Sequence, residues 1–316
     1  MTRDQMIKIG MVICAVVLLC AVIATSTGWF GSDGFASYAN ADKYTSGGTE
    51  ILDIVKNLEV NWTSGRVNVA YHAENTVKLE ETAQRSLSDD EKVRWWMDGD
   101  TLRVQFTKPG IRWNMPGKEL TITLPEGIVL ENAQIQATSA EITVPALKAE
   151  KLEIGSTSGN IEAAAEAKTA TAESTSGDIK LKLSGKADSV RIGSTSGDIS
   201  LEAEKAGSIS AGSTSGGIGI RAEEAEKVKA GSTSGNIDVS LRKVLILDIG
   251  ATSGNVTAAL SETPGFTAEI STVSGKFTNS LALTKDGSRY VCGDGSTDVK
   301  IGTTSGNVRI EAVEEE

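Results

Sequence analysis

The chain has very few of the residues that carry most enzyme chemistry. Its 316 residues include one histidine, His72, and three cysteines. A serine nucleophile needs a nearby base, so a single histidine in a strand-like run argues against a serine hydrolase. The usual zinc sites need more His and Cys than this chain contains. Cys14 and Cys20 lie in an apolar run, which leaves Cys292 without a partner and excludes a disulfide framework.

Aromatic residues and positive charge are also scarce. Aromatics make up 4% of the chain, and the net charge is -11 at pH 7. This acidity argues against nucleic acid and anionic lipid surfaces as direct partners, and we expect no nucleic acid to bind. The 33 glycines and a hydrophobic content of 39% favour regular β structure with many turns over a bulky globular core.

One long apolar run lies near the N-terminus. Residues 9–30 contain 22 residues without a charge, and as a helix at ~1.5 Å per residue they would span a membrane. Arg3 and Lys8 precede the run, so the positive-inside rule predicts a cytoplasmic N-terminus and an extracytoplasmic C-terminal domain. The alternative is a signal peptide cleaved after Ala24. The length of the run favours an uncleaved anchor and a single-pass protein of the cell membrane.

The motif "TSG" recurs along most of the remaining chain. Its copies are about 19 residues apart, which is the signature of a solenoid. The steps are 18, 20, 19, 19, 19 and 21 residues, followed by a final step of 31, and an early copy lies within "LEVNWTSGRVNVAYH". The glycines of these motifs are Gly65, Gly159, Gly177, Gly197, Gly216, Gly235, Gly254, Gly275 and Gly306.

Apolar residues alternate on both sides of each motif, and the phase changes at the glycine. Ile209 and Ala211 precede Gly216 at odd spacing, whereas Ile218 and Ile220 follow it at even spacing. Each half is therefore predicted to be a short strand with one buried face, joined to the next by a corner at the motif. We expect the glycine to supply a positive φ there, with Ser and Asn side chains bonding nearby backbone.

A small residue stands three places before most of these glycines, as Ser213 does before Gly216. We expect these residues to fill the inside of the corner and to hydrogen-bond along the column of stacked coils. The contiguous array, residues 133–281, would contain eight coils and form a rod of roughly 40 Å at ~4.8 Å per coil.

The pattern predicts an all-β chain: a β-solenoid of ~19-residue, two-strand coils, preceded by an irregular β section and one transmembrane helix. We predict a cytoplasmic stub at 1–8, the transmembrane helix at 9–30 and a linker at 31–49. A β-rich section that caps the solenoid follows at 50–130. The repeat region with an acidic tail occupies 131–316.

The candidate binding features are few. The one aromatic-rich region of the sequence contains Trp95, Trp96 and Trp113. We interpret it first as part of the core and cap of the N-terminal section. The alternative is an exposed contact patch for a partner. The acidic loops 88–91, 98–100 and 293–298 lack EF-hand spacing, so Ca²⁺ is a minor alternative. Glycan-cleaving β-helices need paired acids and stacking aromatics, and Phe266 is the one aromatic residue between 133 and 275. We expect no enzyme activity and no cofactor.

The strand ending at Leu124-Pro125 and the units of the form I-x-x-T-S-G-[DN]-I resemble the bacterial "putative adhesin" β-strand-repeat family, also called toastrack, over about residues 51–312. The resemblance implies a β-solenoid in an envelope protein with an N-terminal anchor, and it carries over no catalytic or ligand residues. Two functions stay open. The first is a membrane-tethered scaffold that binds another envelope protein, in some relatives within envelope-stress systems. The second is a surface adhesin for an external ligand. A short rod without a wall-anchoring signal favours the first.

Overall fold

The computed structural model describes residues 38–110 and 115–313. They form two compact units, residues 38–177 (the N-terminal unit) and residues 178–313 (the C-terminal unit). Within this part of the chain there are twenty strands and two short 3₁₀ helices, and no helix is long and apolar enough to cross a membrane. The all-β prediction is confirmed, whereas the predicted membrane helix at 9–30 lies outside the described residues.

The N-terminal unit begins the repeat and carries the irregular β section. Its elements are η1 (Ala41–Lys43), β1 (Thr45–Ser46), β2 (Thr49–Ile51), β3 (Asn57–His72), β4 (Val77–Ala83), η2 (Asp89–Glu91), β5 (Arg94–Asp98), β6 (Thr101–Gln105), β7 (Lys118–Pro125), β8 (Leu130–Ser156) and β9 (Ile161–Ser174).

The C-terminal unit contains four long repeat strands followed by shorter ones. Its elements are β10 (Ile179–Ser194), β11 (Ile199–Ser213), β12 (Ile218–Ser232), β13 (Ile237–Ser253), β14 (Val256–Leu260), β15 (Gly265–Ser274), β16 (Phe277–Asn279), β17 (Thr284–Asp286), β18 (Arg289–Gly293), β19 (Thr297–Ser305) and β20 (Val308–Ala312).

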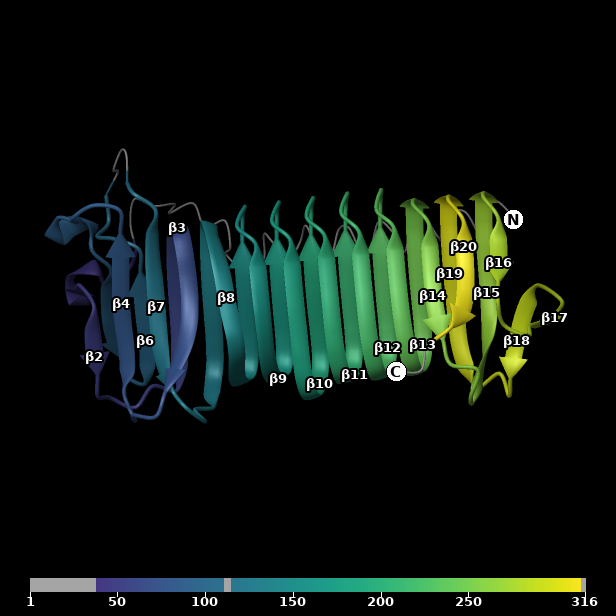
Figure 1. The fold of residues 1–316 in the computed structure, drawn as a ribbon, viewed down its shortest axis with the longest axis horizontal. Helices are drawn as coiled ribbons and strands as arrows, with labels where there is room; N and C mark the ends of the chain where they lie inside the picture. The colour runs from purple at the N-terminus through teal and green to yellow at the C-terminus, as the bar shows by residue number, and fades with distance from the viewer. Residues whose placement is uncertain (1–37, 111–114, 314–316) are drawn as a thin grey trace. The chain divides into compact units, whose positions relative to one another are not determined.

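Strands β10 to β13 are the regular part of the repeat. They pair in parallel, one coil to the next, so that equal repeat positions stack; Ile199, Ile218 and Ile237 form one such column. Figure 1 shows these strands side by side, with the "TSG" turn of each coil at the same end. The buried residues alternate and change phase at the motif as the sequence predicts: Ile209 and Ala211 are buried before it, and Ile218 and Ile220 after it.

Each coil also has a second corner that the sequence analysis missed. In β12 the alternation is interrupted twice between the buried residues Ala222, Ala225 and Val228, so the strand bends opposite the "TSG" turn. This second corner absorbs differences in repeat length, because the register shifts there, between Leu183 and Lys186, in the 20-residue coil. The "TSG" corner can then keep its geometry while coil length varies.

The order of coils in space differs from their order in the sequence at the end of the C-terminal unit. Strand β19 pairs with both β13 and β15, and β20 pairs with both β14 and β16. In Figure 1 the yellow β19 and β20 accordingly lie between the green β13 and β14 and the yellow-green β15 and β16. The predicted uninterrupted array through residue 281 is therefore wrong. The 31-residue final step exists because the chain forms the β17–β18 hairpin and then returns.

The N-terminal unit contains a similar interleaving. Strand β3 pairs in parallel with β8 on one side and with β6 and β7 on the other. It therefore lies between β6 or β7 and β8 in the sheet, although it precedes all three in the chain. Antiparallel strands complete this end: β5 and β1 extend from β6, and β4 and β2 extend from β7. This group, residues 38–125, is called the cap below.

Candidate interaction surfaces

The repeated serines have a structural role inside the "TSG" corner. Ser213 is buried, and its Oγ accepts a hydrogen bond from the backbone N–H of Gly216 at 2.8 Å. The same bond, at 2.7–2.8 Å, recurs at Ser156, Ser174, Ser194 and Ser232. The expected bonding along the column occurs instead where threonine replaces serine: Thr272 donates to the Gly306 carbonyl at 2.9 Å. Each serine thus closes its own turn.

The corner glycines are required for a reason other than the expected one. Among the nine predicted positions, φ is positive at Gly65 alone, so the positive-φ explanation is wrong for the others. A Cβ on Gly216 would instead lie 2.0 Å from the carbonyl oxygen of Gly197, and one on Gly235 would lie 2.0 Å from that of Gly216. Successive coils approach so closely at this corner that the stack has no room for a side chain.

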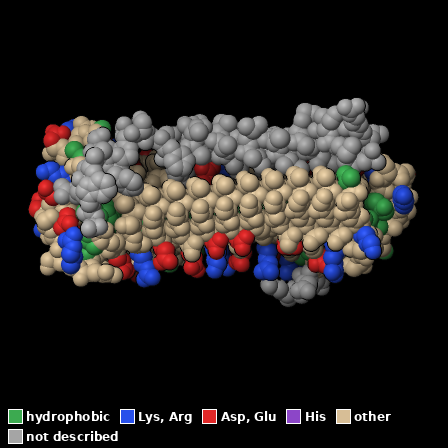
Figure 2. All heavy atoms as spheres, turned by 90° about the horizontal axis from the view of Figure 1, so that it is seen from above, with side chains coloured by type: hydrophobic (Ala, Val, Ile, Leu, Met, Phe, Trp, Pro, Cys, Tyr) green, Lys and Arg blue, Asp and Glu red, His purple; other side chains and the backbone are tan. Residues whose placement is uncertain are grey.

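The residue after each glycine forms a second column, in which a side-chain oxygen accepts the backbone N–H of the adjacent coil. Asp198 Oδ1 accepts from Gly217 at 2.7 Å, and Asn307 Oδ1 accepts from Lys276 at 2.9 Å. Gly217 interrupts the column because it has no side chain. Lys276 ends it, because an ammonium group cannot accept a hydrogen bond. Figure 2 shows a surface that is mostly tan, the colour of backbone and of uncharged polar side chains, with Lys, Arg, Asp and Glu side chains along its border.

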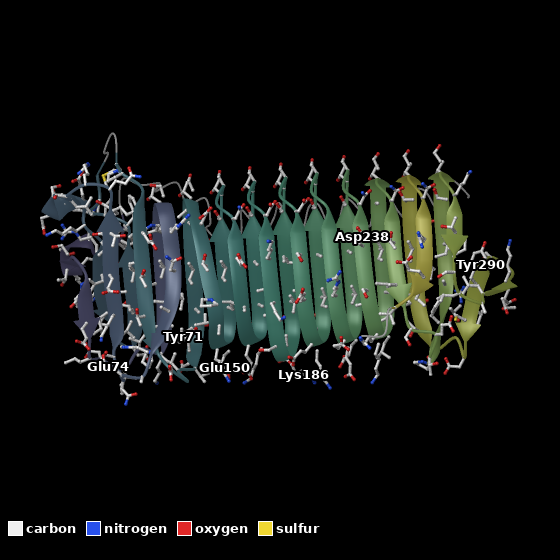
Figure 3. All side chains as sticks on the ribbon, in the orientation of Figure 1. Tyr71, Glu74, Glu150, Lys186, Asp238 and Tyr290 are labelled. Carbon is white, nitrogen blue, oxygen red and sulfur yellow. The ribbon has the colours of Figure 1, made fainter. Side chains whose placement is uncertain are left out.

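Charged side chains outside the corners mostly pair from coil to coil. In the C-terminal unit, Lys205 and Lys243 lie 3.4 and 3.8 Å from the Glu224 carboxylate. Figure 3 shows Glu150 of the N-terminal unit and Lys186 of the C-terminal unit pointing outward at second corners. Exposed pairs of this kind contribute at most about 1 kcal/mol each. Within residues 38–110 and 115–313, no group of three or more His, Cys, Asp or Glu side chains is placed to hold a metal ion.

The predicted tryptophan patch divides between two faces of the cap. Trp95 and Trp96 are consecutive on β5, so they point to opposite sides of the sheet, and both are half-buried. Trp96 packs edge-on against Tyr44, with ring centres 5.7 Å apart, and Lys43 Nζ lies 4.6 Å from its ring centre. Trp113 lies outside the described residues. The two described tryptophans therefore do not form one continuous surface.

The cap holds one buried ion pair that the sequence analysis missed. Lys118 Nζ lies 2.6 Å from the Glu81 carboxylate, beneath the rings of Trp62 and Phe106. Burial lowers the pKa of Lys118, and the hydrogen bond that Lys118 donates to the Glu81 carboxylate acts in the opposite direction. A signal was available: Lys118 shares the inward phase of Leu120, Ile122 and Leu124 in "KELTITLP".

Next to this pair the cap contains a groove of about 1110 Å³. The groove is lined by residues 46–50, where the chain crosses from β1 to β2, and by β4 from Lys78 to Ala83. Its other lining residues are Arg85, Leu87, Lys92, and Glu119 and Thr121 of β7. The sequence did not predict this groove, since it depends on where β2 stops pairing.

These features define a parallel β-repeat protein whose repeated serines and glycines build corners, with a cap that carries a groove. The chain belongs to the family described as Toastrack DUF4097, whose sequence model matches residues 44–311. The resemblance recognised from the repeat motif is therefore confirmed.

Two solved structures are similar at low identity. A Parabacteroides distasonis protein described as a "putative lipid binding protein" is 15% identical with a TM-score of 0.49, over 85% of this chain and 97% of that one. A "putative adhesin" from Bacteroides fragilis is 13% identical with a TM-score of 0.40, over 84% and 97%. Similarities at this level carry no functional argument. A search of curated proteins found no match.

Proposed function

We propose that this protein is a non-catalytic interaction module of the cell envelope. Its N-terminal helix anchors it in the cytoplasmic membrane, and its β-repeat units lie outside, where they bind another envelope protein as a scaffold.

One observation carries the non-catalytic part of this proposal: the buried serines and threonine of the repeat and the buried Lys118 are bonded to the fold itself. Ser213 and its equivalents accept from corner N–H groups, Thr297 donates to the Val244 carbonyl at 2.7 Å, and Lys118 pairs with Glu81. An enzyme of this fold would need acids or bases gathered in a groove and free to act on a substrate. The repeated serines instead stabilise turns.

The membrane anchor and the orientation rest on the sequence. Residues 9–30 are uncharged and long enough to span a bilayer, and Arg3 with Lys8 favours a cytoplasmic N-terminus. Protease added to intact protoplasts should digest the repeat units of a membrane-bound chain. Recovery of a soluble protein that begins near Thr25 would show that the segment is a cleaved signal peptide and would refute the anchor.

The scaffold role has its own tests. If the module serves an envelope-stress system, treatment of cells with wall-active antibiotics should raise its expression, and unchanged expression would remove that part of the proposal. Purified protein should cleave no envelope glycan. Turnover that disappears in Asp198→Asn would refute the non-catalytic assignment, because the Asp198 side chain accepts a structural hydrogen bond from the Gly217 N–H in the corner.

A further inference from the structure

The stack of coils in the C-terminal unit ends at an open strand. In this unit the residue two places after a corner glycine donates its N–H to a carbonyl of the adjacent coil. These bonds, all at 2.9 Å, join Ile218 to Asn236, Ile237 to Asn255, Val256 to Asn307 and Val308 to Lys276. Phe277 is the next donor of the series, and it lies on β16, which among the described strands pairs with β20 alone. No further coil of the described chain accepts the Phe277 N–H.

Burial changes at the same point of the stack. The residues that hold the places of Phe277 and Asn279 in the two preceding coils are Val308 with Ile310 and Val256 with Ala258. All four are 0% exposed. Phe277 is instead partly exposed, and Asn279 is exposed. The inner face of this last coil is therefore open where another coil would cover it.

The β17–β18 hairpin covers only the first half of the last coil. Strand β18 pairs with residues 265–269 of β15, away from the corner (Figure 1). Its Tyr290, labelled in Figure 3, packs against one side of Phe277, with ring centres 4.8 Å apart. Neither strand of the hairpin pairs with β16. The edge of residues 277–279 is therefore available to one more strand.

The backbone of β16 presents donors and acceptors along this edge. On the side of β20, the Lys276 carbonyl accepts from Val308, and the Ser280 N–H donates to the Ile310 carbonyl. Backbone groups alternate sides along a strand in a parallel ladder, so the N–H and C=O groups of Phe277 and Asn279 point away from β20. Unpaired groups of this kind are a template for pairing with another chain.

Lys276 selects the side chain that an added strand would carry. It holds the last place in the column of Asp and Asn side chains, is exposed, and makes no ion pair with any described residue. Opposite charges at facing strand positions attract, so an acidic side chain opposite Lys276 would stabilise the added strand. A second copy would bring its own Lys276, and lysine on an exposed edge keeps copies of a protein apart. The charge therefore favours a different chain as the occupant.

We propose that β16 binds an extended segment of a partner protein by strand addition. The segment lies beside residues 277–279, with an Asp or Glu facing Lys276 and, at the neighbouring position, an apolar residue that covers Phe277. Main-chain hydrogen bonds supply affinity, and the two alternating side chains supply selectivity. This inference rests on the proposed interaction function and gives it a partner class.

The test uses a displayed library of random heptapeptides, panned on the immobilised full-length protein. The library should yield peptides in which an Asp or Glu stands next to an apolar residue. Lys276→Glu should weaken their binding roughly five-fold or more, because it changes attraction across the strands to repulsion. It should also favour versions of the same peptides in which the acid is replaced by Lys. Lys180→Glu is the matched control, since it makes the same charge change at an exposed position of β10, far along the stack from β16.

Asn279→Pro tests the main-chain contacts separately. Proline removes the outward N–H of residue 279 and leaves the bonds between β16 and β20 in place, so the variant should fold and melt close to the parent. Its affinity for the selected peptides should fall roughly ten-fold or more, because the added strand loses a donor and meets the proline ring.

Amide hydrogen exchange places the bound peptide. Saturating peptide should slow exchange at residues 277–279. Peptides that bind Lys276→Glu and Asn279→Pro as well as the parent, or that leave exchange at 277–279 unchanged, would overturn the site. Self-association of the parent that is lost in Asn279→Pro would also overturn it, by showing that a second copy covers the edge. If selected peptides protect another surface, this site fails while the interaction function stands; if no peptide is enriched, both lose support.

Discussion

The close approach of coils at the "TSG" corner makes a sharp prediction for Gly216→Ala. Because the φ of Gly216 is not positive, alanine would be tolerated there if conformation were the whole requirement. On that basis the substitution would stabilise the protein by about 0.4–1 kcal/mol, since alanine restricts the unfolded chain more than glycine does. The packing at the corner predicts the opposite sign.

The magnitude follows from the contacts around Gly216. The added Cβ would lie 2.0 Å from the Gly197 oxygen, and the coils must separate until that distance reaches at least 3.0 Å. Two coil-to-coil hydrogen bonds flank the site, Ser215 N–H to the Thr195 carbonyl and Ile199 N–H to the Gly217 carbonyl, both at 2.9 Å. A displacement of this size breaks them, at about 1 kcal/mol each. With about 1 kcal/mol or more for overpacking, the loss is about 3 kcal/mol.

Gly217→Ala is the matched control, one residue away. Its nearest neighbour would be Asp198 Oδ1 at 3.5 Å, an ordinary contact, so this variant should be neutral or slightly stabilised. Thermal melts should place Gly216→Ala about 6–12 °C below Gly217→Ala. Hydrogen exchange should accelerate mainly in the coils on either side of the change, because repeats support their neighbours. Equal melting of the two variants would refute the close-approach explanation of the corner.

Three further changes test other parts of the fold. Gly217→Asn should restore the interrupted column by accepting the Asn236 N–H, raising the free energy of unfolding by about 1 kcal/mol in urea titrations, whereas Gly217→Ala should not. Tyr71→Phe removes a buried hydroxyl that has no partner among the described residues, so it should be neutral or stabilising by up to about 1 kcal/mol at pH 7. Burial raises the pKa of Tyr71 to about 12, above its unfolded value of 10.0, so the unfolded chain loses this proton first as pH rises. The parent should therefore lose stability relative to Tyr71→Phe between pH 10 and 12. Curves of unfolding free energy against pH that run parallel for the two proteins would contradict this. Lys118→Met should destabilise the cap by about 3–5 kcal/mol, because it leaves Glu81 buried without its cation. Adding Glu81→Gln should recover much of that loss. Equal stability of the single and the double variant would show that the two residues are not coupled.

The repeat itself could be predicted from the sequence, because its signals are local. Alternation around each motif places Ile209, Ile218 and their equivalents inside, and the phase change marks the corner whatever the neighbouring coil is. The role of Gly216 could not be found in this way. Its requirement comes from the carbonyl of another coil, and a sequence pattern contains no distance between coils.

The spatial order of the coils and the groove could not be predicted from the sequence either, because both depend on which strands pair. All coils present the same column of Ile and Val positions, so the pattern of β19 fits beside β13 as well as beside β15. Only the 31-residue final step hinted at a different path. The groove exists because β2 pairs with β4 for three residues and then leaves, and strand ends are weakly marked in sequence. The burial of Lys118, by contrast, could have been predicted, because Lys118 falls at an inward-facing position of the alternating pattern of β7.

The interleaved strands of the C-terminal unit set an order of assembly. A chain that is made from its N-terminus can add β10 to β14 one coil at a time, each on the edge of the last. Strands β15 and β16 then emerge before the strands that join them to β13 and β14 exist. The edges on both sides of that gap stay unpaired until residues 297–312 arrive, and unpaired edges invite association with other chains. A product that stops short of residue 297 therefore keeps two unpaired strand edges that can bind other chains. The sheet of this unit is complete only when β19 and β20 insert between β13–β14 and β15–β16, which are made before them.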